Sequence, residues 1–312
     1  MAGEQLFDSE IERAGDMLRA MRDAFEPSAA LLAEAAADRV LPDEARLAAA
    51  EERLGAMAPD VRTAEAATAR LVAGLAAEIA IRRSEFDTRE RPTRLERLTG
   101  HVSKAAMRRR IEARWRRLGL PGHLAELLRR ADLLVGLVKA ERDILLAQRT
   151  KSEGDLLAFL DGRPYVIGKL RSEIGGAMTR VEASRHTERG VSVFQGFIDA
   201  LNGRVGTCNV FLHKLMADTE DLLILHQAIS EPARQGDEGL SPELFPNLAP
   251  EIGRFTEGML TVRGLDRRRD HADRAFAERF PAEAAGEAAA EARPPKAGLR
   301  LPTLPQPRFL RS

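Results

Sequence analysis

The stretch FQGFIDALNGRVGTCNVFLHKLMADTEDLLILHQAI, residues Phe194–Ile229, decides the fold class of this chain. Its apolar side chains recur at alternating intervals of four and three residues, and the pattern continues until Pro232. This spacing is typical of a long helix that packs along one seam against a neighbouring helix. The seam residues are Phe194, Ile198, Leu201, Val205, Cys208, Leu212, Leu215, Leu222 and Ile229. A helix of about 40 residues is roughly 60 Å long, which favours an elongated bundle.

A second apolar period, through Leu127, Leu134 and Leu145, predicts the antiparallel partner of this helix. This apolar period is interrupted at the polar segment 148–154, where we expect either a shift of register or a break in the helix. Aromatic residues make up only 4% of the chain and charged residues 31%, and Ala, Leu, Arg and Glu dominate. Such a composition favours helices over sheets. We therefore predict an all-α protein, an elongated bundle with long, antiparallel, coiled-coil-like helices.

Prolines, glycines and charge divide the chain into regions. Pro27, Pro42 and Pro59 are expected to separate the first helices, because proline removes a backbone donor and clashes with the preceding turn. The last stretch has lost its apolar period and gained prolines, which predicts disorder. The predicted regions are an acidic N-terminal helical region (1–88), a basic helical connector (89–120), a central long helical hairpin or bundle (121–231), a loop with a last helix (232–280) and a disordered tail rich in Ala and Pro (281–312).

The segment DGRPYVIGKLRSEIGG, residues 161–176, raises the question of a phosphate-binding loop. Such a loop needs four residues between its glycines and a hydroxyl after the lysine, so that amides surround the phosphates. Here five residues separate Gly162 from Gly168, and Leu170 follows Lys169. Gly162 instead suits the end of one helix, and Pro164 suits the first turn of the next. We predict the tip of a helical hairpin.

Residue types that carry catalysis or bind metals are few and scattered. The six histidines form no HExxH or Glu-x-x-His pair that would place two ligands on one helix face. His226 falls on the seam, where a polar side chain commonly fixes register. Cys208, the only cysteine, also falls there and has no identifiable base. The sequence predicts no catalytic residue, no metal and no cofactor.

The charge of the chain is zero overall but unevenly distributed. Residues 1–81 carry 8 basic and 16 acidic side chains, whereas residues 82–130 carry 15 basic and 6 acidic ones. Two short helices, the second capped by Ser103, would accommodate the basic connector. The candidate anion-binding patch consists of Arg108, Arg109, Arg110, Arg114, Trp115, Arg116 and Arg117. These arginines would bind phosphates of nucleic acid or anionic lipid, or pair with the acidic first third of the same chain or of a neighbouring one.

These observations predict a scaffold or adaptor without enzymatic activity, which associates with a protein partner or with itself through the seam. The alternatives are a nucleic-acid-associated protein that binds through residues 89–117, and a helical protein associated with a membrane surface. The abundance of Ala and Arg favours a bacterial source. The first residues lack a basic stretch followed by an apolar one, and no run approaches the roughly 18–20 apolar residues of a transmembrane helix. With a single cysteine, this favours the cytoplasm.

Overall fold

The computed structural model describes residues 2–90, 92–117, 119–173, 179–230, 244–257 and 262–291. Every regular element in these ranges is an α-helix, so the prediction of an all-α chain is confirmed. Four helices are long: α1 (Ala2–Asp38), α2 (Glu44–Glu90), α5 (Leu120–Asp161) and α7 (Arg180–Ser230). The shorter helices are α3 (Arg94–Val102), α4 (Lys104–Arg117), α6 (Arg163–Glu173), α8 (Leu248–Thr256), α9 (Val262–Arg279) and α10 (Pro281–Glu291).

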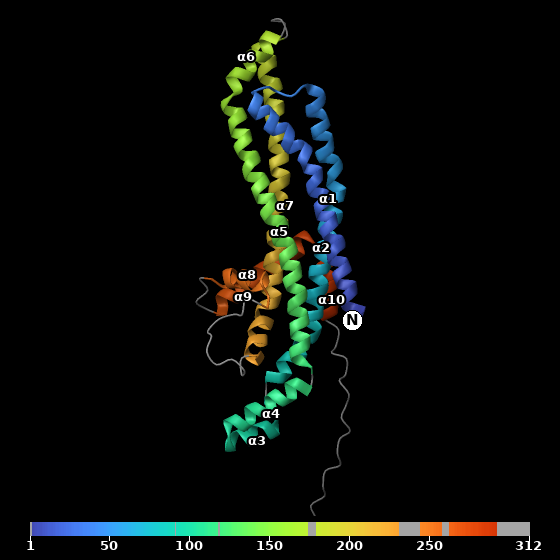
Figure 1. Cartoon of the computed structure of the whole chain (residues 1–312), viewed down its shortest axis with the longest axis vertical. Helices are drawn as coiled ribbons and strands as arrows, with labels where there is room; N and C mark the ends of the chain where they lie inside the picture. Colours follow the sequence, from blue (N-terminus) through green and yellow to red (C-terminus); the bar gives the residue numbers. More distant parts are fainter. Residues whose placement is uncertain are drawn as a thin grey trace, which may run out of the picture.

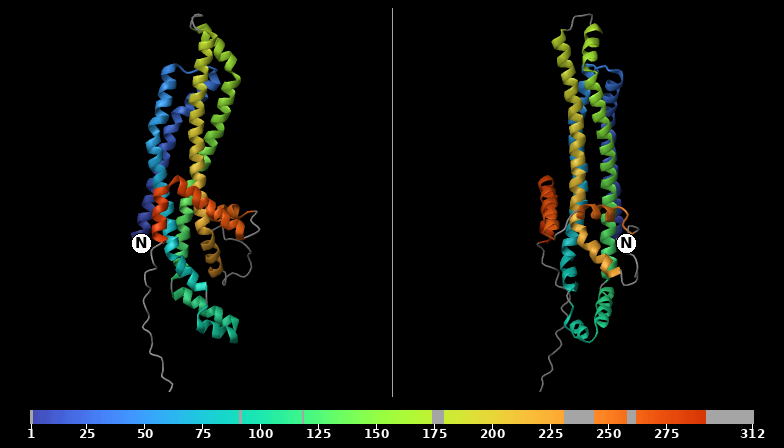
Figure 2. Two further views of the ribbon diagram at one scale, coloured as in Figure 1. Left: turned by 180° about the vertical axis from the view of Figure 1, so that it is seen from behind. Right: turned by 90° about the vertical axis from the view of Figure 1, so that its left-hand side faces the viewer.

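The four long helices lie side by side in alternating directions (Figures 1 and 2). Helix α1 contacts α2 and α5, and α7 contacts the same two helices, so the four close into a bundle. Helices α8 and α9 pack beside the lower half of α7, and α10 covers part of α2. The pair α3–α4 projects beyond the lower end of the bundle (Figure 1).

The seam of α7 forms much of the apolar core. All of its predicted members from Phe194 to Leu222 are buried, while the side chain of Ile229 lies outside the described part. Phe194 packs edge-on against Phe159 of α5, with ring centroids 5.7 Å apart, and Phe197 contacts Phe25 of α1. The seam is therefore filled by helices of its own chain. Its main partner, α5, is the antiparallel helix that the period through Leu127, Leu134 and Leu145 predicted.

Two prolines do not end helices as predicted, because α1 continues through Pro27 and α2 through Pro59. A proline inside a helix costs about 3 kcal/mol through the lost hydrogen bond and the clash with the preceding turn. Burial of apolar side chains on both sides of the proline offsets this cost. In α1, Phe25 precedes Pro27 and Leu32 follows it, and both lie in the core.

Helix α5 also runs without a break across the polar segment 148–154. Leu145, Ser152 and Phe159 are all buried and lie seven residues apart, so the heptad spacing continues through a small polar residue. The Thr150 hydroxyl donates a hydrogen bond to the Leu146 carbonyl, inside the helix rather than at a new helix start. Neither the expected break nor a shift of register is present.

At the upper end of the bundle, α5 ends at Asp161 and α6 begins at Arg163, with Pro164 in its first turn. The residues that were compared with a phosphate-binding loop are thus mostly helical, as predicted. Residues 174–178, between α6 and α7, lie outside the described part of the chain.

The C-terminal region begins differently from the prediction. Residues 281–291 form α10 instead of belonging to a disordered tail, and α10 packs on α2. Alanine-rich sequence fits a helix as well as a tail, and the packing against α2 decides between them. The remainder of the predicted tail, residues 292–312, lies outside the described residues, as does most of the predicted loop, residues 231–243.

Candidate functional site

The candidate site is the helical hairpin α3–α4, which the basic connector forms. Helix α3 starts at a capping box: the Glu96 amide donates to the Thr93 hydroxyl, and the Glu96 carboxylate accepts from the Thr93 amide at 2.6 Å. Helix α4 starts after Ser103, whose hydroxyl accepts from the Ala106 amide at 3.3 Å. The prediction of two short helices, the second capped by Ser103, is confirmed.

The two helices are held together by a buried ion pair. Glu96 of α3 is 5% exposed, and the Arg114 Nε atom of α4 lies 3.0 Å from its carboxylate. At Gly100 the helices approach closely, since a Cβ atom there would lie 2.6 Å from the Met107 sulfur. Arg114 was predicted to belong to the anion-binding patch. The structure places it between the helices, where it stabilises the hairpin.

The other predicted arginines are on the surface where the structure describes them. Arg108, Arg109, Arg110 and Arg117 are exposed, whereas the side chains of Trp115 and Arg116 lie outside the described part. Three further exposed cations, Arg94, Arg97 and Lys104, belong to the same hairpin but were not in the predicted patch. Residues 92–117 contain nine arginines and lysines against two glutamates, so the hairpin carries a strong positive charge.

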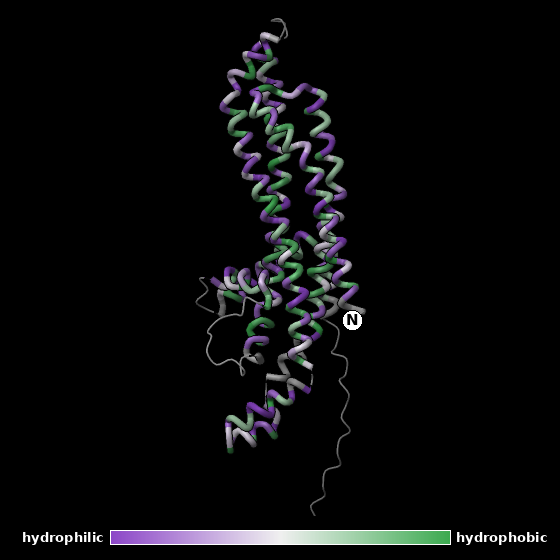
Figure 3. Tube along the Cα trace, viewed as in Figure 1, coloured by the Kyte–Doolittle hydropathy of each residue, from purple (hydrophilic) through white to green (hydrophobic). Residues whose placement is uncertain are grey.

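An apolar stripe on α3 is a feature that the sequence analysis missed. Leu95, Leu98 and Val102 are 68%, 63% and 90% exposed. Their spacing of three and four residues places them on one side of the helix, next to the side that carries Arg94 and Arg97. Figure 3 shows apolar residues interleaved with polar ones at this end of the molecule. The spacing was visible in the sequence, but it could not tell whether the stripe is buried.

Acidic side chains of the first third of the chain form ion pairs with basic residues of the bundle. Asp8 pairs with Arg129 at 3.2 Å, and Glu78 pairs with Arg130 at 3.0 Å, both on α5. Glu44 forms an ion pair with Arg189 of α7. These acidic side chains are therefore neutralised by other helices than α3 and α4.

A buried ion network crosses the middle of the bundle. Arg204 of α7 is 3% exposed, and its guanidinium lies 3.1 Å from the Glu65 carboxylate of α2 and 3.8 Å from that of Glu141 on α5. Arg22 of α1 approaches Glu141 at 3.5 Å, and the Thr207 hydroxyl donates to Glu65 at 2.9 Å. Burial raises the pKa of Glu141 despite its two arginine neighbours. Because the cations balance the carboxylates, the network holds four helices in register.

The residues considered for metal binding or nucleophilic chemistry have packing roles. Burial raises the pKa of the Cys208 thiol to about 12, which leaves it protonated and a poor nucleophile. The His226 ring packs edge-on against Phe245, with centroids 5.5 Å apart. Within the described residues, no group of three or more His, Cys, Asp or Glu side chains is arranged to hold a metal ion.

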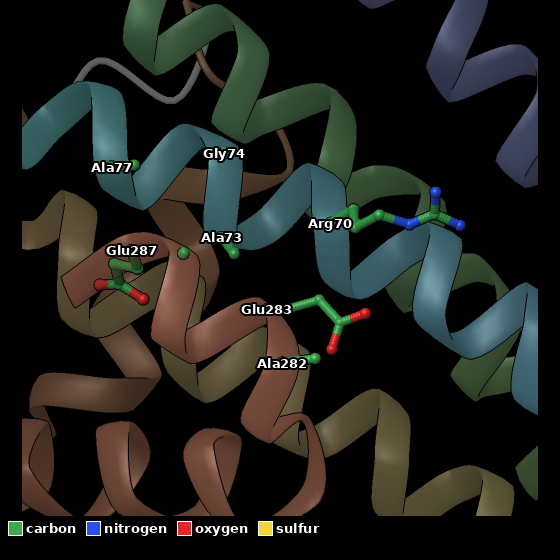
Figure 4. A pocket seen from close by; sticks show the side chains of 8 residues that line it. Arg70, Ala73, Gly74, Ala77, Ala282, Glu283 and Glu287 are labelled. Carbon is green, nitrogen blue, oxygen red and sulfur yellow. The ribbon is translucent and has the colours of Figure 1, made fainter. Parts of the chain in front are cut away.

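A groove of about 430 Å³ lies between α2 and α10 (Figure 4). Small residues form its walls, namely Ala73, Gly74 and Ala77 of α2 with Ala282 and Gly286 of α10. Arg70 and Glu283 extend toward the same side of the groove (Figure 4). The small side chains explain how α10 packs close to α2, and this groove is a helix-packing surface.

None of the described helices is long and apolar enough to cross a membrane. Comparison of the chain with protein-family models, with curated proteins and with solved structures gives no match.

Proposed function

We propose that this protein is a non-enzymatic helical adaptor that binds an anionic lipid surface through the α3–α4 hairpin. The observation that carries the proposal is the exposed stripe Leu95, Leu98 and Val102 beside exposed arginines. An apolar face flanked by cations is what a helix needs to lie in the interface of an anionic membrane. The long bundle would hold this hairpin at one end, and the lateral surfaces of the bundle would bind a protein partner.

The cationic side chains and the apolar stripe of the hairpin would contribute differently to membrane binding. Each Lys or Arg near an anionic bilayer contributes about 1 kcal/mol, and this contribution is screened by salt. Burial of apolar side chains contributes roughly 25 cal/mol per Å² and does not depend on salt in this way. Together they would give binding that requires anionic lipid but survives moderate salt.

Nucleic acid is the alternative partner for the same arginines. Phosphate contacts would use Arg108, Arg109 and Arg110, and the affinity would fall steeply with salt. Such contacts have no use for the apolar stripe on α3. The stripe therefore favours lipid over nucleic acid, and it also makes the two partners separable by mutation.

The test is co-sedimentation of the full chain with vesicles of phosphatidylcholine, with or without phosphatidylglycerol, and a parallel titration with a short DNA duplex. The first variant replaces Leu95, Leu98 and Val102 by serine. Its matched control replaces Leu6, Ile81 and Leu157, which are also exposed but lie along the bundle. The second variant replaces Arg108, Arg109 and Arg110 by glutamine, and its control changes Arg53, Arg62 and Arg70, which are exposed on α2.

We expect binding to vesicles that contain phosphatidylglycerol, with loss of binding in both hairpin variants and retention in both controls. Duplex binding that is abolished by the arginine variant but unaffected by the serine variant would replace lipid with nucleic acid as the partner. Vesicle binding that is equal in hairpin variants and controls would refute the proposal. Circular dichroism and thermal unfolding verify that each variant retains the fold.

A further inference from the structure

A second surface with an unusual charge lies where α8 and α9 pack against α7, apart from the hairpin. A cavity of about 390 Å³ opens there. This volume falls within the usual range for small-molecule sites, about 300–1,000 Å³. Its apolar wall comes from Leu212 and Met216 of α7 and from Phe255 of α8, all of which are buried.

The polar wall of the cavity is mainly basic. It contains Arg142 of α5, Arg254 of α8 and Arg268 of α9, together with two histidines, His213 and His271. Glu251 is the one acidic residue among the described residues that line the cavity. Its carboxylate is already bound by two cations, Arg254 at 2.7 Å and Lys139 at 3.2 Å. The arginines thus leave an excess of positive charge before either imidazole is protonated.

Arg268 is a cation of the cavity wall for which the described part of the chain shows no acidic partner. Its guanidinium donates hydrogen bonds to the backbone carbonyls of Phe255 and Glu257 and lies 5.8 Å from the centroid of the Phe255 ring. Arg142, across the cavity on α5, is only 18% exposed and uses Nε and Nη2 to bind the exposed carboxylate of Asp143.

The electrostatic effect on His213 agrees with this arrangement. Partial burial lowers the pKa of the His213 imidazole, and the positive charges of His271, Arg268 and Arg142 lower it further. The cavity is thus a region of positive potential bounded by apolar side chains. An anion would relieve the mutual repulsion of these groups, and an attached apolar moiety would cover Leu212 and Phe255.

We propose that this cavity binds a small phosphorylated organic molecule. The phosphate lies at Arg142, Arg268, His213 and His271, and the organic part lies against Leu212, Met216 and Phe255. A phosphate carries two charges near neutral pH and several acceptor oxygens, which matches arginine donors better than a single carboxylate does. This site is independent of the lipid-binding hairpin, because it uses other helices and other residues.

The experiment follows the histidine signals of the full chain by NMR during titration with phenyl phosphate, inorganic phosphate and phenol. His213 and His271 report on the cavity, and the exposed His101 on α3 serves as an internal reference for binding to the hairpin. We expect phenyl phosphate to shift both cavity signals saturably and to raise the pKa of His213, because a nearby anion stabilises the imidazolium. Inorganic phosphate should bind more weakly, and phenol should not shift these signals.

Two variants test the roles of the arginines. Arg268→Gln and Arg142→Gln should each weaken phenyl phosphate binding by about tenfold, the loss expected for one charge-assisted hydrogen bond. The matched control is Arg274→Gln, an exposed arginine of α9 that does not line the cavity, and it should bind as the wild type does. If Arg268→Gln fails to fold, which its thermal unfolding would reveal, Arg142→Gln decides. Signals that do not respond to phenyl phosphate, or an unchanged affinity in a folded cavity variant, would overturn the proposal.

Discussion

The Asp132 carboxylate on α5 accepts a hydrogen bond from the Leu248 amide at the first turn of α8, at 2.8 Å. The same oxygen accepts from the Asn247 amide at 2.8 Å, and the second oxygen accepts from the Asn247 side chain at 3.1 Å. The residue at the cap of α8, Asn247, makes no capping bond through its own side chain. A residue far away in the sequence therefore supplies the cap, and it ties α8 to the bundle.

This arrangement predicts a large effect for Asp132→Ala. The change leaves two backbone donors of α8 without an acceptor near the core, which should lower the free energy of unfolding by about 2–3 kcal/mol. Amide hydrogen exchange should accelerate at Asn247 and Leu248. The control is Asp143→Ala, which removes an exposed carboxylate from the same helix and should cost less than about 1 kcal/mol. Equal unfolding curves for Asp132→Ala and the wild type would show that α8 is held by other contacts.

Two glycines of α5 should respond to alanine in opposite ways. A Cβ atom at Gly136 would lie 2.9 Å from the Asn247 side-chain nitrogen, which is fixed by Asp132, whereas a Cβ atom at Gly154 would contact nothing within 4 Å. Gly154→Ala should therefore stabilise the protein by roughly 0.5–1 kcal/mol, the usual gain inside a helix. Gly136→Ala should not stabilise the protein, because the added methyl group would clash with the Asn247 side chain. Urea unfolding measures both, and a stabilised Gly136→Ala variant would contradict the close packing of α8 on α5.

The buried network predicts that Arg204 cannot be replaced alone. In Arg204→Met the carboxylates of Glu65 and Glu141 lose their shared cation, and we expect a loss of about 3–5 kcal/mol at neutral pH. Adding Glu65→Gln and Glu141→Gln to this variant should recover much of the loss. The exposed Arg19, which pairs with Asp16 on the surface, provides the control Arg19→Met, with a cost below about 1 kcal/mol. A single Arg204→Met variant as stable as this control would refute the interpretation.

Asp218 predicts a specific pH dependence of stability. Burial and the carboxylates of Glu287 and Asp273 raise its pKa from 3.8 to about 7, against the opposing effect of Lys214. The folded state then binds a proton more tightly than the unfolded chain. The stability due to this proton is complete below about pH 4 and is lost as the pH rises to about 7.

Asp218→Asn should flatten this part of the stability profile and should be relatively more stable than the wild type above neutral pH. The measurement is the free energy of unfolding in urea at a series of pH values. Asp199→Asn, an exposed change on the same helix, should leave the profile unchanged. A profile for Asp218→Asn with the wild-type slope would assign the pH dependence to other groups.

The sequence predicted those features that depend on local periodicity. The spacing from Phe194 to Leu222 identified a face of α7 that is buried, and Ser103 identified the start of α4. The effect of Pro27 was predicted wrongly, because burial of apolar side chains against other helices offsets the local cost of the proline. A short stretch of sequence does not reveal that burial. The phosphate cavity and the cap at Asp132 were missed for a related reason. Their residues come from helices far apart in the sequence, and only the packing of those helices brings them together.

The position of α10 has a consequence for biosynthesis. Helix α10 covers a face of α2. Its Glu287 carboxylate lies 2.8 Å from the ammonium group of Lys214, a buried residue of α7. A ribosome at about 5–20 residues per second releases α2 many seconds before α10. During that interval the alanine face of α2 stays uncovered, and Lys214, once it has been synthesised, still lacks the Glu287 carboxylate. Cotranslational folding would therefore stop at an incomplete bundle, and a nascent chain that ends before Pro281 would expose a surface open to chaperones and proteases.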